Sequence, residues 1–155
     1  MTQASRMLAI FAGSRVAYGS TKIKRVGRNG KTEADSWIVR DPITEEAMQE
    51  HLDGSLGVGS IPIDEDNACR FGCIDIDVYD LDHKQLQQKI AQLKFPLSHC
   101  RSKSGGAHLY LFLEQREPAA VVREFLTEMS IALGFSGSEI FPKQDTILSE
   151  QGDVG

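Results

Sequence analysis

The sequence predicts an α+β fold in which a small N-terminal α/β lobe precedes a larger lobe with the element order β-α-β-β-α-β. Two observations predict the larger lobe. Apolar and polar residues alternate over 71–79 and 108–114, the period of a half-buried strand, and apolar residues recur at helical spacing over 82–94 and 118–134. The first forty residues lack both patterns and hold glycine turn signals, so they predict irregular or β structure.

The N-terminal lobe is expected to hold one short helix and one strand after this beginning. Its turn signals are Gly13, Gly19, Gly27 and the dipeptide Asn29-Gly30. Thr44 is expected to cap a helix through Asp53, and Gly54 occupies the position that a C-terminal glycine prefers. A strand over Leu56–Ile63 and a polar turn over 64–67 follow.

The second lobe is expected to begin with a strand at Phe71–Tyr79. Asp82 and Gln85 resemble a capping box that opens a helix to Lys94, and Pro96 stops this helix. The later elements are a strand at Leu97–Arg101, a turn at Ser102–Gly106, a strand at His108–Glu114, a helix from Pro118 to Gly134 and a strand at Ser138–Phe141. This order is the ferredoxin-like arrangement, shared by RRM folds, in which both helices cover one face of the sheet. We therefore expect one domain of two lobes, residues 1–68 and 69–155.

Period-two alternation assigns side chains to the free face of this sheet. The residues expected to face the helices are Ile74, Ile76, Val78, Leu109, Leu111, Leu113 and Ile140. The residues expected on the open face are Asp75, Asp77, Tyr79, His108, Tyr110, Phe112, Glu139 and Phe141. Three carboxylates and a histidine from three strands therefore converge on one surface.

The two aspartates at positions 75 and 77 suggest a metal site. Like charges two residues apart on an apolar strand repel each other unless a cation lies between them. Oxygen ligands favour Mg²⁺ or Mn²⁺, and Mg²⁺ is usually held by one or two carboxylates together with substrate phosphates. Solvent-facing aspartates of an amphipathic strand remain an alternative.

The turn before the His108 strand has the residues of an anion site. Gly105 and Gly106 let backbone N–H groups approach an anion closely, Arg101 and Lys103 bring positive charge, and the Ser104 hydroxyl donates a hydrogen bond. The turn resembles a triphosphate cradle, although the Walker A spacing is absent. The alternative interpretation is that these residues form only a hairpin turn without a ligand.

The distribution of charge predicts a nucleic-acid contact that the net charge of −5 conceals. Residues 1–40 hold eight Lys and Arg against two acidic residues, whereas the remainder holds nine against twenty. The candidate phosphate-backbone contacts are Lys22, Lys24, Arg25, Arg28 and Lys31. A solvated basic loop is the alternative.

The three cysteines indicate a reducing compartment, because they are odd in number and their spacing matches no disulfide framework. With no secretory segment and no apolar run long enough for a membrane span, we expect a cytoplasmic protein without a membrane partner. Cys69, Cys73, His99 and Cys100 together invite a zinc interpretation. However, Cys69 and Cys73 would lie ~13 Å apart along a strand, too far to chelate together.

Three motifs carry a resemblance to a known family. They are Cys73-Ile74-Asp75-Ile76-Asp77, Ser104-Gly105-Gly106-Ala107-His108 and Ser138-Glu139-Ile140-Phe141-Pro142-Lys143-Gln144. With Phe11-Ala12-Gly13 and Cys69-Arg70-Phe71-Gly72, they resemble the catalytic core of the archaeo-eukaryotic primase superfamily, most of all the primases of mobile elements and TOTE-type conflict systems. The resemblance covers nearly the whole chain.

The resemblance implies a primase or primase-polymerase that performs metal-dependent nucleotidyl transfer. It implies that Asp75, Asp77 and Glu139 bind two Mn²⁺ or Mg²⁺ ions, although the family more commonly has Asp at the third position. His108, Ser104 and Lys103 would hold the incoming nucleoside triphosphate, and we add Lys143 of the third motif to this set. The expected partners are a single-stranded DNA template, a primer and, in the full-length protein, a helicase or other replication module.

The resemblance also implies that the second lobe continues beyond Gly155, so we expect the chain to be a fragment. Two other functions share parts of the pattern. An RRM-like, non-catalytic single-strand binder would use the aromatic residues of the open face, but two exposed aspartates would repel its phosphates. Another palm-like nucleotidyl transferase, such as a nucleotide cyclase, would share the carboxylates without needing the basic arm or the Ser104–His108 turn.

Overall fold

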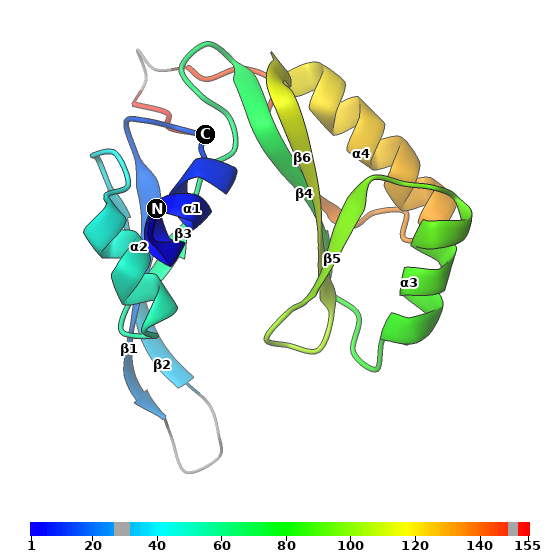
Figure 1. Cartoon of the computed structure of the whole chain (residues 1–155), viewed down its shortest axis with the longest axis horizontal. Coiled ribbons are helices and arrows are strands. Elements are labelled where there is room, and N and C mark those ends of the chain that lie inside the picture. Colours follow the sequence, from blue (N-terminus) through cyan, green and yellow to red (C-terminus); the bar gives the residue numbers. More distant parts are fainter. Residues whose placement is uncertain (27–31, 149–151) are drawn as a thin grey trace.

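The computed structural model describes residues 1–26, 32–148 and 152–155, which form two lobes side by side (Figure 1). Each lobe contains one antiparallel sheet, with strand orders β2-β1-β3 and β5-β6-β4-β7. Two helices accompany each sheet, so the predicted α+β class is confirmed. In the described parts of the chain, no helix is long and apolar enough to cross a membrane.

The N-terminal lobe begins with a helix, α1 (Gln3–Ile10), where the sequence predicted only irregular or β structure. The prediction was wrong because the helix has only eight residues and its start signal is a single residue, Thr2. The Thr2 hydroxyl accepts the Ser5 N–H at 3.0 Å and donates to the Glu45 carboxylate at the start of the next helix. Packing against that helix therefore stabilises α1, since a helix this short is marginal alone.

The rest of this lobe consists of a hairpin, a helix and a short strand. The hairpin is formed by β1 (Tyr18–Val26) and β2 (Thr32–Val39), while the predicted Asn29-Gly30 turn lies outside the described residues. Helix α2 (Glu45–Leu52) begins at the predicted cap, where Thr44 Oγ1 accepts the Ala47 N–H. Strand β3 covers only Gly57–Gly59, because its partner residues on β1 end there and the chain then runs toward Pro62, which cannot donate to a ladder.

The second lobe has the predicted ferredoxin-like order. Its elements are β4 (Ala68–Ile76), α3 (His83–Gln92), β5 (Leu97–Arg101), β6 (Ala107–Pro118), α4 (Ala119–Leu133) and β7 (Glu139–Phe141). The predicted first and third strands, β4 and β6, are paired in the middle of the sheet, and β7 borders β4. The Asp82 cap is confirmed, since its carboxylate accepts the Gln85 N–H at 2.9 Å. Both helices lie on one side of this sheet (Figure 1).

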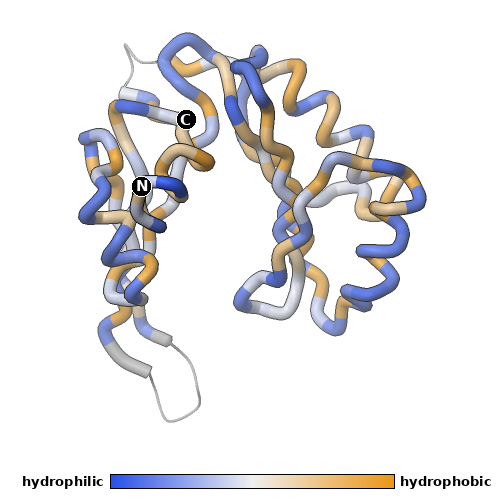
Figure 2. The backbone as a smooth tube through the Cα atoms, viewed as in Figure 1, coloured by the Kyte–Doolittle hydropathy of each residue, from blue (hydrophilic) through white to orange (hydrophobic). Residues whose placement is uncertain are grey.

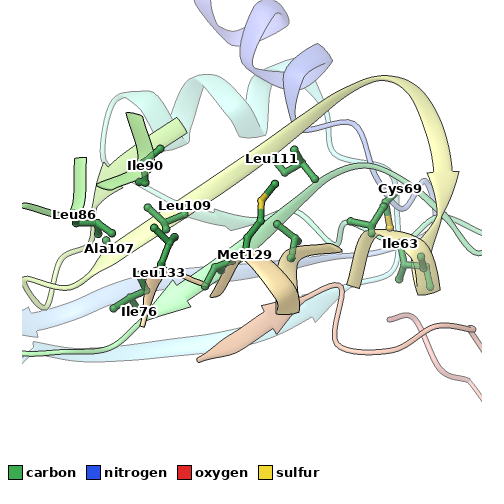
Figure 3. Close-up of a cluster of buried hydrophobic side chains, with 14 residues drawn as sticks. Ile63, Cys69, Ile76, Leu86, Ile90, Ala107, Leu109, Leu111, Met129 and Leu133 are labelled. Carbon is green, nitrogen blue, oxygen red and sulfur yellow. The ribbon is translucent and has the colours of Figure 1, made fainter. Parts of the chain in front are cut away.

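The main core lies between the second sheet and its two helices (Figure 3). Its fully buried centre includes Ile74, Ile76, Leu109 and Leu126, each of which contributes roughly 1.5–3 kcal/mol by leaving water. Gly72 allows α4 to pack closely, because a Cβ there would lie 2.6 Å from the Leu126 side chain. Figure 2 shows hydrophilic (blue) and hydrophobic (orange) residues interspersed along the chain.

The first strand of this lobe ends earlier than the sequence predicted. Alternation placed Val78 among the core residues and Tyr79 on the open face, but β4 ends at Ile76 and both residues are exposed. The chain turns here toward α3, and Asp80 adopts a positive φ of 61° that is incompatible with a strand. Asp77 therefore lies immediately beyond the strand rather than within it.

The connection between the two lobes is organised around a buried carboxylate. Asp64 is 6% exposed, and its Oδ1 accepts the N–H groups of Asp66 at 2.9 Å and Ala68 at 3.1 Å. Its Oδ2 accepts from Arg116 on β6 at 2.8 Å, and Arg116 also contacts the exposed Asp66 carboxylate at 2.8 Å. This set of contacts ties the interlobe segment to the second sheet.

We expect Asp64→Ala to lower the free energy of unfolding by about 2 kcal/mol, because it leaves two backbone donors without their acceptor. Asp66→Ala removes a separate, exposed ion pair to the same Arg116 side chain and should leave the unfolding midpoint nearly unchanged. Urea unfolding of both variants checks the difference. Equal losses would show that the ion pair, rather than the buried carboxylate, holds the connection.

Candidate active site on the open face of the second sheet

Three polar residues form a row across β6, β4 and β7. In the strand register, Asp75 is paired with His108 on one side and with Glu139 on the other. Directly opposed residues of antiparallel strands project from the same face, with Cβ atoms ~5 Å apart. The neighbouring Ile74 and Ile76 are buried toward the helices, so this row lies on the opposite face, which the helices leave free.

His108 connects Asp75 to Tyr110. The His108 Nε2 atom lies 3.4 Å from Asp75 Oδ1, and its Nδ1 atom lies 3.4 Å from the Tyr110 hydroxyl. Burial is the main cause that raises the pKa of Tyr110 to about 12, so this hydroxyl keeps its proton and can donate to Nδ1. A neutral His108 would then carry its hydrogen on Nε2, toward the carboxylate.

The other two predicted carboxylates have partners of their own. The Glu139 carboxylate contacts Lys143 at 2.7 Å, and Lys143 also lies over the Phe141 ring, 5.1 Å from its centroid. Asp77 Oδ1 lies 3.5 Å from the Ser104 hydroxyl, at the limit of a hydrogen bond. The structure thus brings Asp75, His108 and Glu139 into one row, with Asp77 at the end of β4.

The donor set fits a divalent cation in part. Asp75 and Asp77 offer carboxylate oxygens, which suit Mg²⁺ or Mn²⁺ bound together with substrate phosphates. Among the residues that the structure describes, no three His, Cys, Asp or Glu side chains are grouped closely enough to hold a metal ion. The Glu139 carboxylate is paired instead with Lys143.

The Ser102–Gly106 turn packs against the end of β4. The Ser102 N–H donates to the Gly106 carbonyl at 2.9 Å, and the Gly105 N–H donates to the Ser102 carbonyl at 3.2 Å. Gly105 has a φ of 95°, and a Cβ on Gly106 would lie 2.0 Å from the Ile76 carbonyl oxygen. Both glycines are therefore required by the turn itself, and together they hold Ser104 beside Asp77.

A cavity of about 460 Å³ lies between this row and the N-terminal lobe. Asp75, His108 and Tyr110 line it from the second sheet, and Met48 and His51 line it from α2. The Phe11 ring also lines this cavity and makes edge contacts to Phe71, Tyr110 and Phe112 at centroid distances of 5.3, 5.2 and 5.5 Å. These aromatic side chains of the open face are thus packed against the N-terminal lobe.

His51 is a cavity residue to which the sequence assigned no role. Its Nδ1 accepts the Val58 N–H at 3.1 Å, which leaves the hydrogen of a neutral ring on Nε2. The sequence held no signal for this contact, because it depends on how α2 packs against β3.

The remaining predicted site residues are more dispersed. Arg101 and Lys103 are exposed at the Ser102–Gly106 turn. Lys22 is exposed on β1, and Lys24 pairs with Asp35 of β2 at 2.6 Å. Only the backbone of Arg25 is described, and Arg28 and Lys31 lie outside the described residues.

Cys69 and Cys73 are buried thiols, which does not favour the zinc interpretation. Burial raises the pKa of each to about 12, whereas zinc binds the thiolate form. His99, the nitrogen ligand of that proposed set, contacts His83 instead.

A comparison with protein families gives one finding. The family model described as "TOTE conflict system, Archaeo-Eukaryotic Primase domain" matches residues 19–155, which include both sheets. A search of curated proteins finds no match.

We expect Gly106→Ala to destabilise the protein by about 3 kcal/mol, because its methyl group would push the turn away from the backbone of β4. Gly105→Ala meets open space and should cost only about 1 kcal/mol, the strain of a left-handed residue. Urea unfolding compares the two variants. A Gly106→Ala protein as stable as Gly105→Ala would contradict the close packing of the turn.

Proposed function

Because the chain belongs to the archaeo-eukaryotic primase family of TOTE conflict systems, we propose that it is a primase-polymerase domain. It would join nucleotides on a single-stranded DNA template, either beginning or extending a primer. Nucleotidyltransferases of this family use divalent metal ions and nucleoside triphosphates. Both lobes would belong to one catalytic domain, residues 1–68 and 69–155, and a helicase is the proposed partner module in a longer protein.

The observation that supports this proposal is that three features lie close together near the end of β4. The Asp75–His108 pair lines the interlobe cavity, the Ser104 turn meets Asp77 at the end of β4, and glycines form that turn. Carboxylates for a cation, donors for an anion and a cavity for an organic group thus occur within a few residues of one strand end. A metal-bound nucleotide needs these three kinds of contact together.

The carboxylates are proposed to hold the cation. Asp75 and Asp77 would bind Mg²⁺ or Mn²⁺, with Glu139 as a further ligand after its release from Lys143. When bound, two such ions would neutralise charge on the attacking and leaving oxygens. Asp75 is suited to this role because it is partly exposed on a rigid strand and faces the cavity.

The turn and its neighbours are proposed to hold the triphosphate. Lys103 and Arg101 supply positive charge, Ser104 and His108 donate hydrogen bonds, and Gly105 and Gly106 shape the turn so that it can lie close to the anion. Lys143 would join them from the β7 side. A primer 3′-hydroxyl oxygen then forms a bond to the α-phosphorus, its proton leaves, and the bond to the β-phosphate breaks to release pyrophosphate.

The contacts of Phe11 favour this function over an RRM-like single-strand binder. Such a module presents aromatic rings of its sheet to bases, whereas Phe11 packs against three of the rings on this sheet, those of Phe71, Tyr110 and Phe112. The family match likewise favours a primase over a nucleotide cyclase.

We expect Asp75→Asn and Asp77→Asn each to lower nucleotide incorporation by about 100-fold or more, because a metal ligand loses its charge at nearly constant volume. The assay supplies a single-stranded DNA template, labelled nucleotides and Mn²⁺ or Mg²⁺, with and without a primer. Asp80→Asn is the control, since it removes an exposed charge in the turn after β4 and Asn tolerates the positive φ there.

Undiminished incorporation by either variant would refute the metal assignment. A folded wild-type chain that incorporates no nucleotide under any of these conditions would refute the proposed function.

We propose that Lys22 contacts the phosphate backbone of the template. Lys22→Ala should reduce the slope of log affinity against log salt by about 0.7 for single-stranded DNA, the loss of one phosphate contact. Lys84→Ala, which removes an exposed charge on α3, should leave the slope unchanged. Fluorescence titration with a labelled oligonucleotide at several salt concentrations measures both, and equal slopes would exclude Lys22 from the interface.

A further inference from the structure

Two histidines that the proposed site does not use contact each other next to the Ser102–Gly106 turn. His83 is the first residue of α3, and His99 lies on β5. The Nδ1 atom of His83 is 3.0 Å from the Nε2 atom of His99, and the rings are nearly parallel, with an interplanar angle of 13°. The Nε2 atom of His83 lies 2.8 Å from the carbonyl oxygen of Gly105, in the Ser102–Gly106 turn.

The chemistry of these atoms fixes the direction of one hydrogen bond and, for a neutral His83, of the other. A carbonyl oxygen only accepts, so the hydrogen of His83 is on Nε2. In a neutral His83, Nδ1 is then an acceptor, and His99 must donate its Nε2–H to it. Burial, followed by the nearby His83 and Arg101, lowers the pKa of His99, which favours its neutral form. When both rings are neutral, the three groups form one chain of donors from His99 through His83 to Gly105.

This chain adds a side-chain contact to a peptide whose neighbouring groups already bond within the turn, as the Gly105 N–H does to the Ser102 carbonyl. Gly105 has a φ of 95°, and glycine backbones adopt many other conformations at low cost. Fixing the Gly105 carbonyl toward His83 also directs the N–H of Gly106 the opposite way, because a trans peptide carries these groups on opposite sides. His83 and His99 attach this peptide to α3 and β5, two elements of the rigid second lobe.

We propose that His83 and His99 are positioning residues for triphosphate binding. By bonding the Gly105 carbonyl, His83 keeps a partial negative charge away from the phosphates and directs the Gly106 N–H to the opposite side, while the N–H groups of Ser102 and Gly105 donate within the turn. His99 keeps His83 in the required tautomer. The inference rests on the proposed function, since it assumes that the Ser102–Gly106 turn binds the triphosphate.

The test compares the affinities of variants of the full chain for ATP and for dATP in the presence of Mg²⁺. His83→Ala should weaken binding about threefold to tenfold, the effect of one lost hydrogen bond. His83→Gln should remain within about twofold of wild type, because the Gln amide can donate to Gly105 and accept from His99. His99→Ala should have a smaller effect than His83→Ala. The double variant should bind no more weakly than His83→Ala alone, because both residues act through one chain.

Two controls separate positioning from general damage. Gln87 lies one turn further along α3 at an exposed position, and the Gln87→Ala variant should bind ATP and dATP as wild type does. In steady-state assays, His83→Ala should raise KM for the nucleotide more than it lowers kcat. NMR of the imidazole nitrogens in the wild-type chain reads the tautomers without any nucleotide, so it tests the donor chain even where a variant fails to fold.

The outcomes distinguish the two proposals. If the wild-type chain binds neither nucleotide, the proposed function fails, and the role of the turn fails with it. If wild type binds and a folded His83→Ala binds equally well, the positioning role alone is wrong. A His83 tautomer with its hydrogen on Nδ1 would also overturn the inference, whereas an Nε2–H tautomer together with rescue by Gln would support it.

Discussion

The pairing register of β4 and β6 is the constraint on which the site depends. It sets His108 opposite Asp75 and Ala107 opposite Ile76, so that Gly106 approaches the Ile76 carbonyl within a distance that excludes any side chain. Because side chains alternate along a strand, a slip of one residue would turn Asp75 toward the buried face. The apolar residues of the core, such as Ile74 and Leu109, therefore determine where the polar residues meet.

The N-terminal lobe converts this sheet face into a cavity. An antiparallel sheet with helices on one side leaves its other face to solvent. Here Phe11 packs on the Tyr110 ring of that face, and Met48 and His51 line the same cavity as Asp75 and His108. The Asp64 contacts hold the chain where it passes from one lobe to the other. The placement of the polar row in a cavity thus depends on contacts that neither sheet makes alone.

Local patterns in the sequence predicted the second lobe and the faces of its strands. Alternation placed Asp75 and His108 on one face correctly, and Asp82 correctly marked the start of α3. The same alternation extended the first strand too far, because polar and apolar residues continue to alternate through Val78 although the backbone turns at Asp80. Contacts such as His83 with His99 could not be predicted, since they join residues from different elements whose relative placement arises only on folding.

The present partners of the carboxylates are themselves the proposed ligands of the triphosphate. Asp75 contacts His108, Asp77 contacts Ser104 and Glu139 contacts Lys143, so each negative group lies beside a donor or cation. Under the proposed function, a cation that binds the carboxylates would release these donors at the moment when phosphate oxygens arrive to accept from them. Neither the carboxylates nor their present donors would then be left without a partner. This matters because an unsatisfied polar group in a partly buried site costs about 1–3 kcal/mol. Cation and nucleotide are therefore expected to bind together more favourably than either binds alone.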